Sequence, residues 1–329
     1  MTPPRALVTG ANGQDGRLLT GTLVARGWDV IAVVRPGHAG GPPAEGIVAT
    51  SPVDLGDAEA TRRVILDHAP DHIFHLGAVS SVAQSWADPL TTTRVNGMST
   101  VAVLEAAADL GDRGHPVHVV NASSAEIFAG AAVTPQDERT PIAPNSPYGA
   151  AKAYGHTMGA VARARGVEVA NAILYPHESP LRPSRFVTRK ITAGVAAIAT
   201  GRATQIVLGN IDARRDWGWA PDYVDAMTIL ADHRANDDYV VATGESHSVG
   251  DFLATAFRVA GIESWHEMVT ADPALVRPAD GVDLVGDHRK ITEEFGWRPT
   301  TVFDEVVAAM VRHDLNLASR SDDRRAAAV

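Results

Sequence analysis

The chain of 329 residues contains no cysteine. Disulfide bonds, thiolate catalysis and cysteine-ligated metal sites are therefore excluded, and we expect no metal site. No apolar stretch is long enough to span a membrane. The N-terminal residues Met1–Arg5 also lack the apolar core of a signal peptide. From these absences we expect a soluble, cytoplasmic protein.

Positive charge is scarce as well. The 29 lysines and arginines are outnumbered by 39 aspartates and glutamates, which gives a formal net charge of −10. A general nucleic-acid binder needs a basic face, so we expect no nucleic-acid partner. An anionic small ligand would have to be met by locally placed arginines, because the overall field is unfavourable.

A glycine-rich loop stands near the N-terminus. The apolar run Ala6–Thr9 leads into Gly10-Ala-Asn-Gly-Gln-Asp-Gly16, and a helical pattern begins at Arg17. Glycines allow the backbone to approach a pyrophosphate, and the N-terminus of a helix offers amides and a positive dipole end. The pattern therefore predicts a dinucleotide site. A tight turn that simply requires glycine is the alternative interpretation.

The end of the second predicted strand, Asp29–Val34, bears on which dinucleotide is bound. An acidic residue there usually accepts from a ribose 2′-hydroxyl, whereas arginine suits a 2′-phosphate. The chain has Val34-Arg35-Pro36. This favours NADP, with NAD possible. Arg35 as an ordinary exposed loop residue is the alternative.

Strand and helix patterns alternate through the N-terminal half. Strand patterns recur at 47–49 with 53–55, at 73–76, at 117–121 and at 168–174, and helical patterns cover 58–68 and 89–110. This order predicts an α/β fold with a Rossmann-like, doubly wound parallel sheet covered by helices.

The sequence pattern changes after Leu174: prolines become frequent and the predicted helices and strands are shorter. We predict a Rossmann domain over residues 1–174 and a smaller, mixed α/β substrate-binding domain over 175–318, with some later segments returning to the first domain. The polar, alanine-rich residues 319–329 are predicted to form a disordered tail.

The catalytic prediction centres on Asn145-Ser-Pro-Tyr-Gly-Ala-Ala-Lys152. Tyr148 and Lys152 are four residues apart and so lie on one face of a helix. A neighbouring ammonium would stabilise a phenolate and bring the pKa of the phenol down from its usual value near 10. Tyr148 could then move a hydroxyl proton while a nicotinamide moves the hydride. Most such pairs, however, are solvated helix surface.

Two further candidates follow the strand at 117–121. Ser124 and Glu126 are two residues apart, so in an extended chain both would face the same side. They would stand at the carboxyl edge of the sheet, where ligands bind in open α/β folds. The alternative is that Glu126 is a plain surface residue.

Several longer sequence runs are similar to those of a known enzyme family. The chain resembles the extended short-chain dehydrogenases/reductases, and among them the GDP-mannose 4,6-dehydratase family. The resemblance covers roughly Arg5 to Arg312. It rests on these runs: Thr9-Gly-x-x-Gly-x-x-Gly16, Asp54-Leu55, His75-Leu-Gly-Ala78, Asn145–Lys152, His177-Glu-Ser-Pro180, Phe186-Val-Thr-Arg-Lys-Ile191, Arg215-Asp-Trp-Gly218, Asp222-Tyr-Val224, Ala242-Thr-Gly244, Gly286-Asp287 and Gly296-Trp297.

The resemblance implies a lyase reaction with an internal redox cycle. A ketone forms at C4 of the hexose, a glutamate removes the C5 proton, the C6 hydroxyl leaves as water, and the hydride returns to C6. The implied substrate is GDP-mannose and the implied product is GDP-4-dehydro-6-deoxy-mannose. The matching catalytic positions are Ser124, Glu126, Tyr148 and Lys152.

The resemblance also implies binding residues. The cofactor positions are Gly10, Asn12, Gly13, Gln14, Asp15, Gly16, Arg35, Asp54, Leu55, Leu76, Gly77, Ala78, Tyr148, Lys152 and His177. The nucleotide-sugar positions are Ser85, Glu126, Val187, Lys190, Arg215 and Arg277. Arginines suit phosphate recognition because their donors form a fork. A homodimer or homotetramer is the expected assembly.

The chain departs from the family pattern at Pro36, Pro176 and Leu181. The family usually has a basic residue in place of Pro36 and of Leu181, and an asparagine in place of Pro176. A dehydratase for a different nucleotide-linked hexose is therefore an alternative. So are a nucleotide-sugar 4-reductase or epimerase on the same scaffold, and a catalytically silent binding protein.

Overall fold

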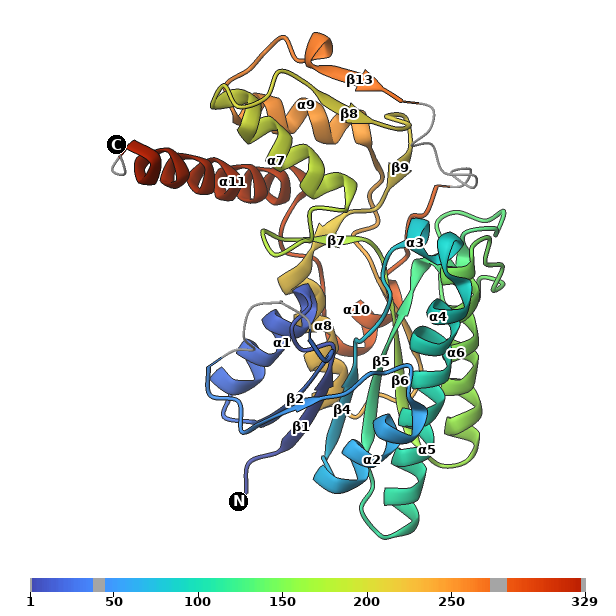
Figure 1. Cartoon of the computed structure of the whole chain (residues 1–329). Coiled ribbons are helices and arrows are strands. Elements are labelled where there is room, and N and C mark those ends of the chain that lie inside the picture. Colours follow the sequence, from blue (N-terminus) through green and yellow to red (C-terminus); the bar gives the residue numbers. More distant parts are fainter. Residues whose placement is uncertain (1, 38–44, 273–282, 327–329) are drawn as a thin grey trace.

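A computed structural model describes residues 2–37, 45–272 and 283–326. Its centre is a seven-stranded, entirely parallel sheet in the order β11-β6-β5-β4-β1-β2-β3 (Figure 1). The strands are β1 Arg5–Thr9, β2 Asp29–Val34, β3 Ala49–Pro52, β4 His72–His75, β5 His118–Ser124, β6 Glu168–Leu174 and β11 Asp238–Val241. The strand order reverses between β1 and β4, which makes that edge the expected ligand site.

Helices cover both faces of this sheet, since its strands are apolar on both sides. One face holds α1 Gln14–Ala25, α8 Ala220–Asp232 and α10 Arg289–Phe295. The other holds α2 Ala58–His68, α5 Ser99–Asp112 and α6 Pro147–Ala164. The predicted Rossmann-like, doubly wound sheet is therefore confirmed.

The seventh strand comes from the C-terminal half of the chain. β11 pairs in parallel with β6, from Asp238 opposite Asn171 to Val241 opposite Leu174. Helices α8 and α10 also come from the C-terminal half and pack on the sheet. The chain thus crosses between its two parts several times after residue 174.

The remaining elements form a smaller, mixed α/β cap above the carboxyl edge of the sheet (Figure 1). Its core gathers side chains from three helices, α7 Val187–Ala199, α9 Val249–Val259 and α11 Phe303–Ala326. Short strand pairs complete the cap and its junction with the sheet domain: β8 Ile206–Leu208 with β13 Val269–Ala271, β7 His177–Glu178 with β10 Gly218–Trp219, and β9 Arg214–Arg215 with β12 His247–Ser248. A 3-10 turn, η3 His266–Met268, precedes β13.

The helix predicted over 89–110 is interrupted. A separate helix, α3 Val82–Ala87, comes first, and α4 Pro89–Thr93 continues into a π-helical turn, η1 Arg94–Met98, before α5. In that turn the Asn96 side chain accepts from the Val79 amide at 2.7 Å and donates to the Val79 carbonyl at 3.0 Å. The wider turn directs Asn96 inward to hold the segment after β4.

Two smaller predictions differ from the structure. The third strand spans Ala49–Pro52 instead of two pieces on either side, because pairing with β2 selects its register. The predicted disordered tail from residue 319 is replaced by helix as far as Ala326, since α11 continues through a segment without glycine or proline. Over the described residues, every helix is too short or too polar to cross a bilayer.

Candidate active site

The glycine-rich loop lies between β1 and α1. Gly10 has a φ of 69°, and a β-carbon there would lie 2.8 Å from the Cα of Gly77. A β-carbon on Gly16 would lie 2.2 Å from the Gly10 carbonyl oxygen. Gly13 caps α1 without any side-chain hydrogen bond, so the first amides of the helix are left to a ligand. The loop therefore fits a dinucleotide pyrophosphate.

Two loop residues expected to bind the cofactor also hold another part of the chain through their side chains. The Gln14 amide nitrogen donates to the His177 carbonyl oxygen at 3.1 Å, and its oxygen accepts from the Ser179 hydroxyl at 2.9 Å. The Asp15 carboxylate lies 3.0 Å from Nε2 of His177. The side chains of Gln14 and Asp15 thus clamp the loop at 177–179 to the start of α1.

His177 is buried and has a partner on each side of its ring. Nδ1 contacts the Tyr175 carbonyl oxygen at 2.7 Å, and the ring stacks on Tyr223 with centroids 4.4 Å apart. Burial is the largest influence on the pKa of His177 and lowers it, but the charge of Asp15, its hydrogen bond and the Tyr175 carbonyl together outweigh burial and raise that pKa. Both ring nitrogens of His177 therefore lie close to an acceptor oxygen.

The other predicted cofactor positions follow the carboxyl ends of the strands. Arg35 is exposed just after β2, and Asn12 is half-buried in the glycine loop. Asp54 accepts from the Gly56 amide at 2.9 Å. Leu55 packs against Gly77, whose own amide donates to the Thr9 hydroxyl at 3.0 Å. Leu76 and Ala78 flank that glycine.

Helix α6 brings Tyr148 to this edge at its first turn. Ser146 caps the helix by accepting from the Gly149 amide at 3.0 Å, and Pro147 fits the first helical position. Ser85, predicted to contact the sugar, is fully buried beneath Tyr148. Its hydroxyl donates to the Val82 carbonyl at 2.6 Å and accepts from the Tyr148 amide at 3.1 Å. The described contacts of Ser85 therefore fix the start of α6.

Ser124 and Glu126 stand opposite that helix start. Ser124 ends β5, and its hydroxyl accepts from the Glu126 amide at 3.3 Å. Glu126 lies in a 3-10 turn, η2 Ala125–Phe128, so the expected extended pairing of the two residues is wrong. The serine caps this turn, and Glu126 is half-buried in it.

The pKa of Tyr148 moves in the direction opposite to the prediction. Burial raises the pKa of Tyr148 to about 12, and the charge of Glu126 also raises it. A hydrogen bond with Ser124 and the charge of Arg182 act to lower it. The predicted downward shift is wrong because desolvation of the phenolate is the largest influence.

Lys152 lies one turn further along the same buried face of α6. Its ammonium donates to the Ala122 carbonyl oxygen at 2.7 Å. Burial lowers the pKa of Lys152 to about 8. Tyr148 and Lys152 therefore share one helix face as predicted, and the lysine is anchored to β5.

Arg182 is a candidate site residue that sequence reasoning missed. Its Nε lies 3.2 Å from a carboxylate oxygen of the buried Glu178, and its guanidinium lies 3.8 Å from the centre of the Phe186 ring. Its charge acts to lower the pKa of both Tyr148 and Asp15. Its place after the His177–Pro180 run was the only available signal, and a loop sequence does not reveal which arginine turns inward.

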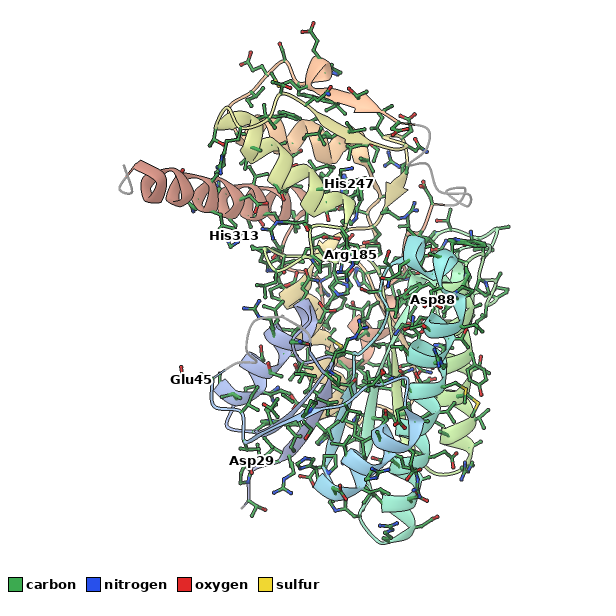
Figure 2. All side chains as sticks on the ribbon, in the orientation of Figure 1. Asp29, Glu45, Asp88, Arg185, His247 and His313 are labelled. Atoms are coloured by element: carbon green, nitrogen blue, oxygen red, sulfur yellow. The ribbon has the colours of Figure 1, made fainter. Side chains whose placement is uncertain are left out.

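Three of the other predicted nucleotide-sugar positions lie on the cap. Val187 begins α7 and is half-buried, Lys190 is exposed one turn later, and Arg215 ends β9. Arg277 lies outside the described residues. Figure 2 shows Arg185 where the cap meets the sheet domain, and its guanidinium donates to the Ser80 hydroxyl at 3.3 Å.

Comparison with known proteins agrees with this geometry. The family model described as GDP-mannose 4,6 dehydratase matches residues 7–310. The chain belongs to the GDP-mannose 4,6-dehydratase family. It is 39% identical to GDP-mannose 4,6 dehydratase 1 of Arabidopsis thaliana, over 96% of this chain and 91% of the relative. It is 36% identical to the human GDP-mannose 4,6 dehydratase, over 96% and 93%.

A solved structure gives the fold an independent match. The UDP-glucose 4-epimerase of Thermus thermophilus, in complex with NAD, superposes with a TM-score of 0.81. The two sequences are 26% identical, and the match covers 94% of this chain and 98% of the epimerase. The clamp of Gln14 and Asp15 on His177 joins two of the runs on which the family resemblance rests, the glycine-rich loop and His177-Glu-Ser-Pro180.

Proposed function

We propose that the chain catalyses the 4,6-dehydration of GDP-mannose to GDP-4-dehydro-6-deoxy-mannose, as a hydro-lyase. The observation that carries the proposal is the position of Glu126, in a turn whose backbone lies against Gly149, the residue next to Tyr148. A reductase or epimerase needs a proton donor at the hydroxyl but no second carboxylate beside it. A dehydratase does, because a proton must leave C5 before the C6 hydroxyl can depart.

The roles then follow from position. Tyr148 takes the proton of the C4 hydroxyl, and the Ser124 hydroxyl holds the oxygen that becomes the C4 ketone. Glu126 removes the C5 proton that this ketone acidifies and gives it to the departing C6 hydroxyl, so that one water is lost. Tyr148 returns its proton to C5. Ser124 and Arg182 both favour the phenolate that this cycle requires.

The cofactor is a nicotinamide dinucleotide, and we propose NADP. Its chemistry when bound is to hold the hydride between its departure from C4 and its return to C6. The glycine loop, the uncapped start of α1 and Gly77 would hold the dinucleotide. Arg35 supports NADP, because the end of β2 offers a cation to a 2′-phosphate.

The substrate class is a nucleotide sugar, with GDP-mannose as the proposed member. Val187, Lys190 and Arg215 would meet the nucleotide, and Arg277 remains an expectation from the resemblance. Arg182, whose charge acts on both Tyr148 and Asp15, would add a cation between the dinucleotide and the nucleotide sugar. Because arginine pairs with phosphate oxygens through a fork of donors, it offsets the absence of a second basic residue at Leu181.

We also propose a homodimer. Four large apolar side chains are exposed on α4, the π-helical turn and α6: Leu90, Met98, Tyr154 and Val161. α4 and the turn pack beside α6, so two copies could cover these side chains in one four-helix contact. Size-exclusion chromatography with light scattering would test this assembly.

The function is tested by incubating the purified protein with GDP-mannose and a trace of NADP⁺. Mass spectrometry should show the loss of one water from the sugar, with the cofactor oxidised at the end. Continuous oxidation of NADPH on a 4-keto sugar would instead identify a reductase. Turnover of another nucleotide-linked hexose, with none of GDP-mannose, would correct the substrate.

A further inference from the structure

A buried ion pair joins two helices of the cap. Asp314 on α11 is 4% exposed, and its carboxylate accepts from Nη2 of Arg189 and from the Thr192 hydroxyl, each at 2.6 Å. Both partners lie on α7, and the surrounding contact is apolar, with residues such as Val195 and Met310. Buried ion pairs are often replaceable by apolar residues without loss of stability. Stability alone therefore does not explain this pair.

The other end of Arg189 holds the loop after β7. Its Nη1 donates to the Pro180 carbonyl oxygen and, at 3.4 Å, to the Arg182 carbonyl oxygen. One guanidinium thus ties α11 to the backbone on both sides of Leu181. Arginine can make these contacts together because its donors are rigidly spaced, which a lysine ammonium cannot reproduce.

The side chain of Arg182 is fixed separately. Glu178, which is 1% exposed, lies 3.2 Å from its Nε and accepts from the Thr188 hydroxyl at 2.6 Å. Phe186 lies under the guanidinium. Arg189 therefore places the backbone of Arg182, while Glu178 and Phe186 hold its guanidinium. Glu178 follows His177, the residue that pairs with Asp15, and the charge of Arg182 acts to lower the pKa of both Asp15 and Tyr148.

We propose that Asp314 and Arg189 are positioning residues of the active site, acting through Arg182. The inference rests on the proposed function insofar as Arg182 serves the bound nucleotide sugar and dinucleotide. It assigns a role in the site to the C-terminal helix. Asp314 and Arg189 themselves lie behind the loop that carries Arg182.

The test is a double-mutant cycle between D314N and R182Q. We expect D314N to lower kcat/KM for GDP-mannose about ten-fold in the wild-type background and by less than about two-fold in the R182Q background. R189K keeps a positive charge for Asp314 but loses the forked donors of arginine, so it should lower kcat/KM as D314N does. It replaces D314N in the cycle if D314N folds poorly. D304N, which removes an exposed carboxylate of the same helix paired with Arg258, is the matched control.

The same cycle is measured on the dissociation constant for NADP⁺ by calorimetry. If the wild-type protein does not convert GDP-mannose, the proposed function fails, and the NADP⁺ cycle still decides the role of Asp314. Equal losses from D314N in both backgrounds would show a structural role only and overturn the proposal. So would a D304N effect as large as that of D314N.

Discussion

Gly149 lies directly against the backbone of Glu126: a β-carbon added at position 149 would lie 2.6 Å from the Glu126 carbonyl oxygen. This contact joins the start of α6 to the turn that carries the glutamate. Glycine allows the two segments to approach this closely, and Tyr148 is the adjacent residue. The distance between the phenol and the carboxylate therefore depends on position 149.

We expect Gly149→Ala to lower kcat about ten-fold and to destabilise the protein by about 1–3 kcal/mol, because the added methyl group separates the two segments. Steady-state kinetics and urea unfolding would measure both effects. Gly111→Ala is the control, since Gly111 lies in α5 with open space around its Cα. That change should leave kcat unaltered and raise stability slightly. Equal effects at the two positions would contradict the argument.

Glu126→Gln should separate dehydration from hydride transfer. We expect dehydration to fall about 100-fold or more, because an amide cannot take the C5 proton. Tyr148 is unaltered, so oxidation at C4 should still generate the absorbance of a reduced nicotinamide in a single turnover. Glu168→Gln, which removes an exposed partner of Arg234, is the matched control. Full dehydratase activity in Glu126→Gln would exclude this carboxylate as the base.

Arg35→Ala should weaken NADP⁺ binding about ten-fold or more and leave NAD⁺ binding nearly unchanged. The reason is the loss of a charge-assisted contact to the 2′-phosphate, which NAD⁺ lacks. Calorimetry with both dinucleotides measures the ratio. Arg26→Ala, which breaks an exposed ion pair with Asp232, should alter neither affinity. Equal weakening of both dinucleotides by Arg35→Ala would refute the assignment to the 2′-phosphate.

His72 should make the protein less stable in acid. Burial, together with the charge of His118, lowers the pKa of His72 from 6.5 to about 4. A histidine with a lowered folded-state pKa contributes stability above its unfolded pKa and loses it as the pH falls toward the folded value. Between about pH 7.5 and about pH 5.5 the loss from this residue should be about 1 kcal/mol.

Urea unfolding of His72→Phe at the two pH values measures this contribution. The variant should lose about 1 kcal/mol less stability on acidification than the wild type, since phenylalanine does not titrate. The ring would keep its contact with Trp28, which lies 5.0 Å away between centroids. His313→Gln on α11 is the control and should follow the wild type. An acid sensitivity unchanged by His72→Phe would point to other groups.

The sheet was predictable because its strands are short apolar runs in a fixed order. Glu168–Leu174 and Ala58–His68 begin and end where the sequence predicts. The π-helical turn at Asn96 was not predictable, because it depends on Val79, which lies in another segment. Likewise, an aspartate in a glycine loop carries no sign that its partner is His177, which is far along the chain.

The proposed catalytic side chains were predicted mainly from the resemblance, and their surroundings were not predicted. Spacing placed Tyr148 and Lys152 on one face, but it could not show that burial would dominate the pKa of the phenol. Arg182 was not predicted because the position of its guanidinium is set by contacts with Glu178 and Phe186 that form only on folding. Local sequence thus indicates which groups are present, and tertiary contacts decide how they are charged and where they point.

The contribution of β11 to the sheet has a consequence for how such enzymes can diverge. Without residues 238–241, β6 would become an unprotected edge strand, and α8 and α10 would leave a bare apolar face. Neither part of the chain is therefore an exchangeable module. A new sugar specificity cannot be acquired by swapping the cap in one piece at residue 174, and substitutions must accumulate within loops that the sheet already holds in place.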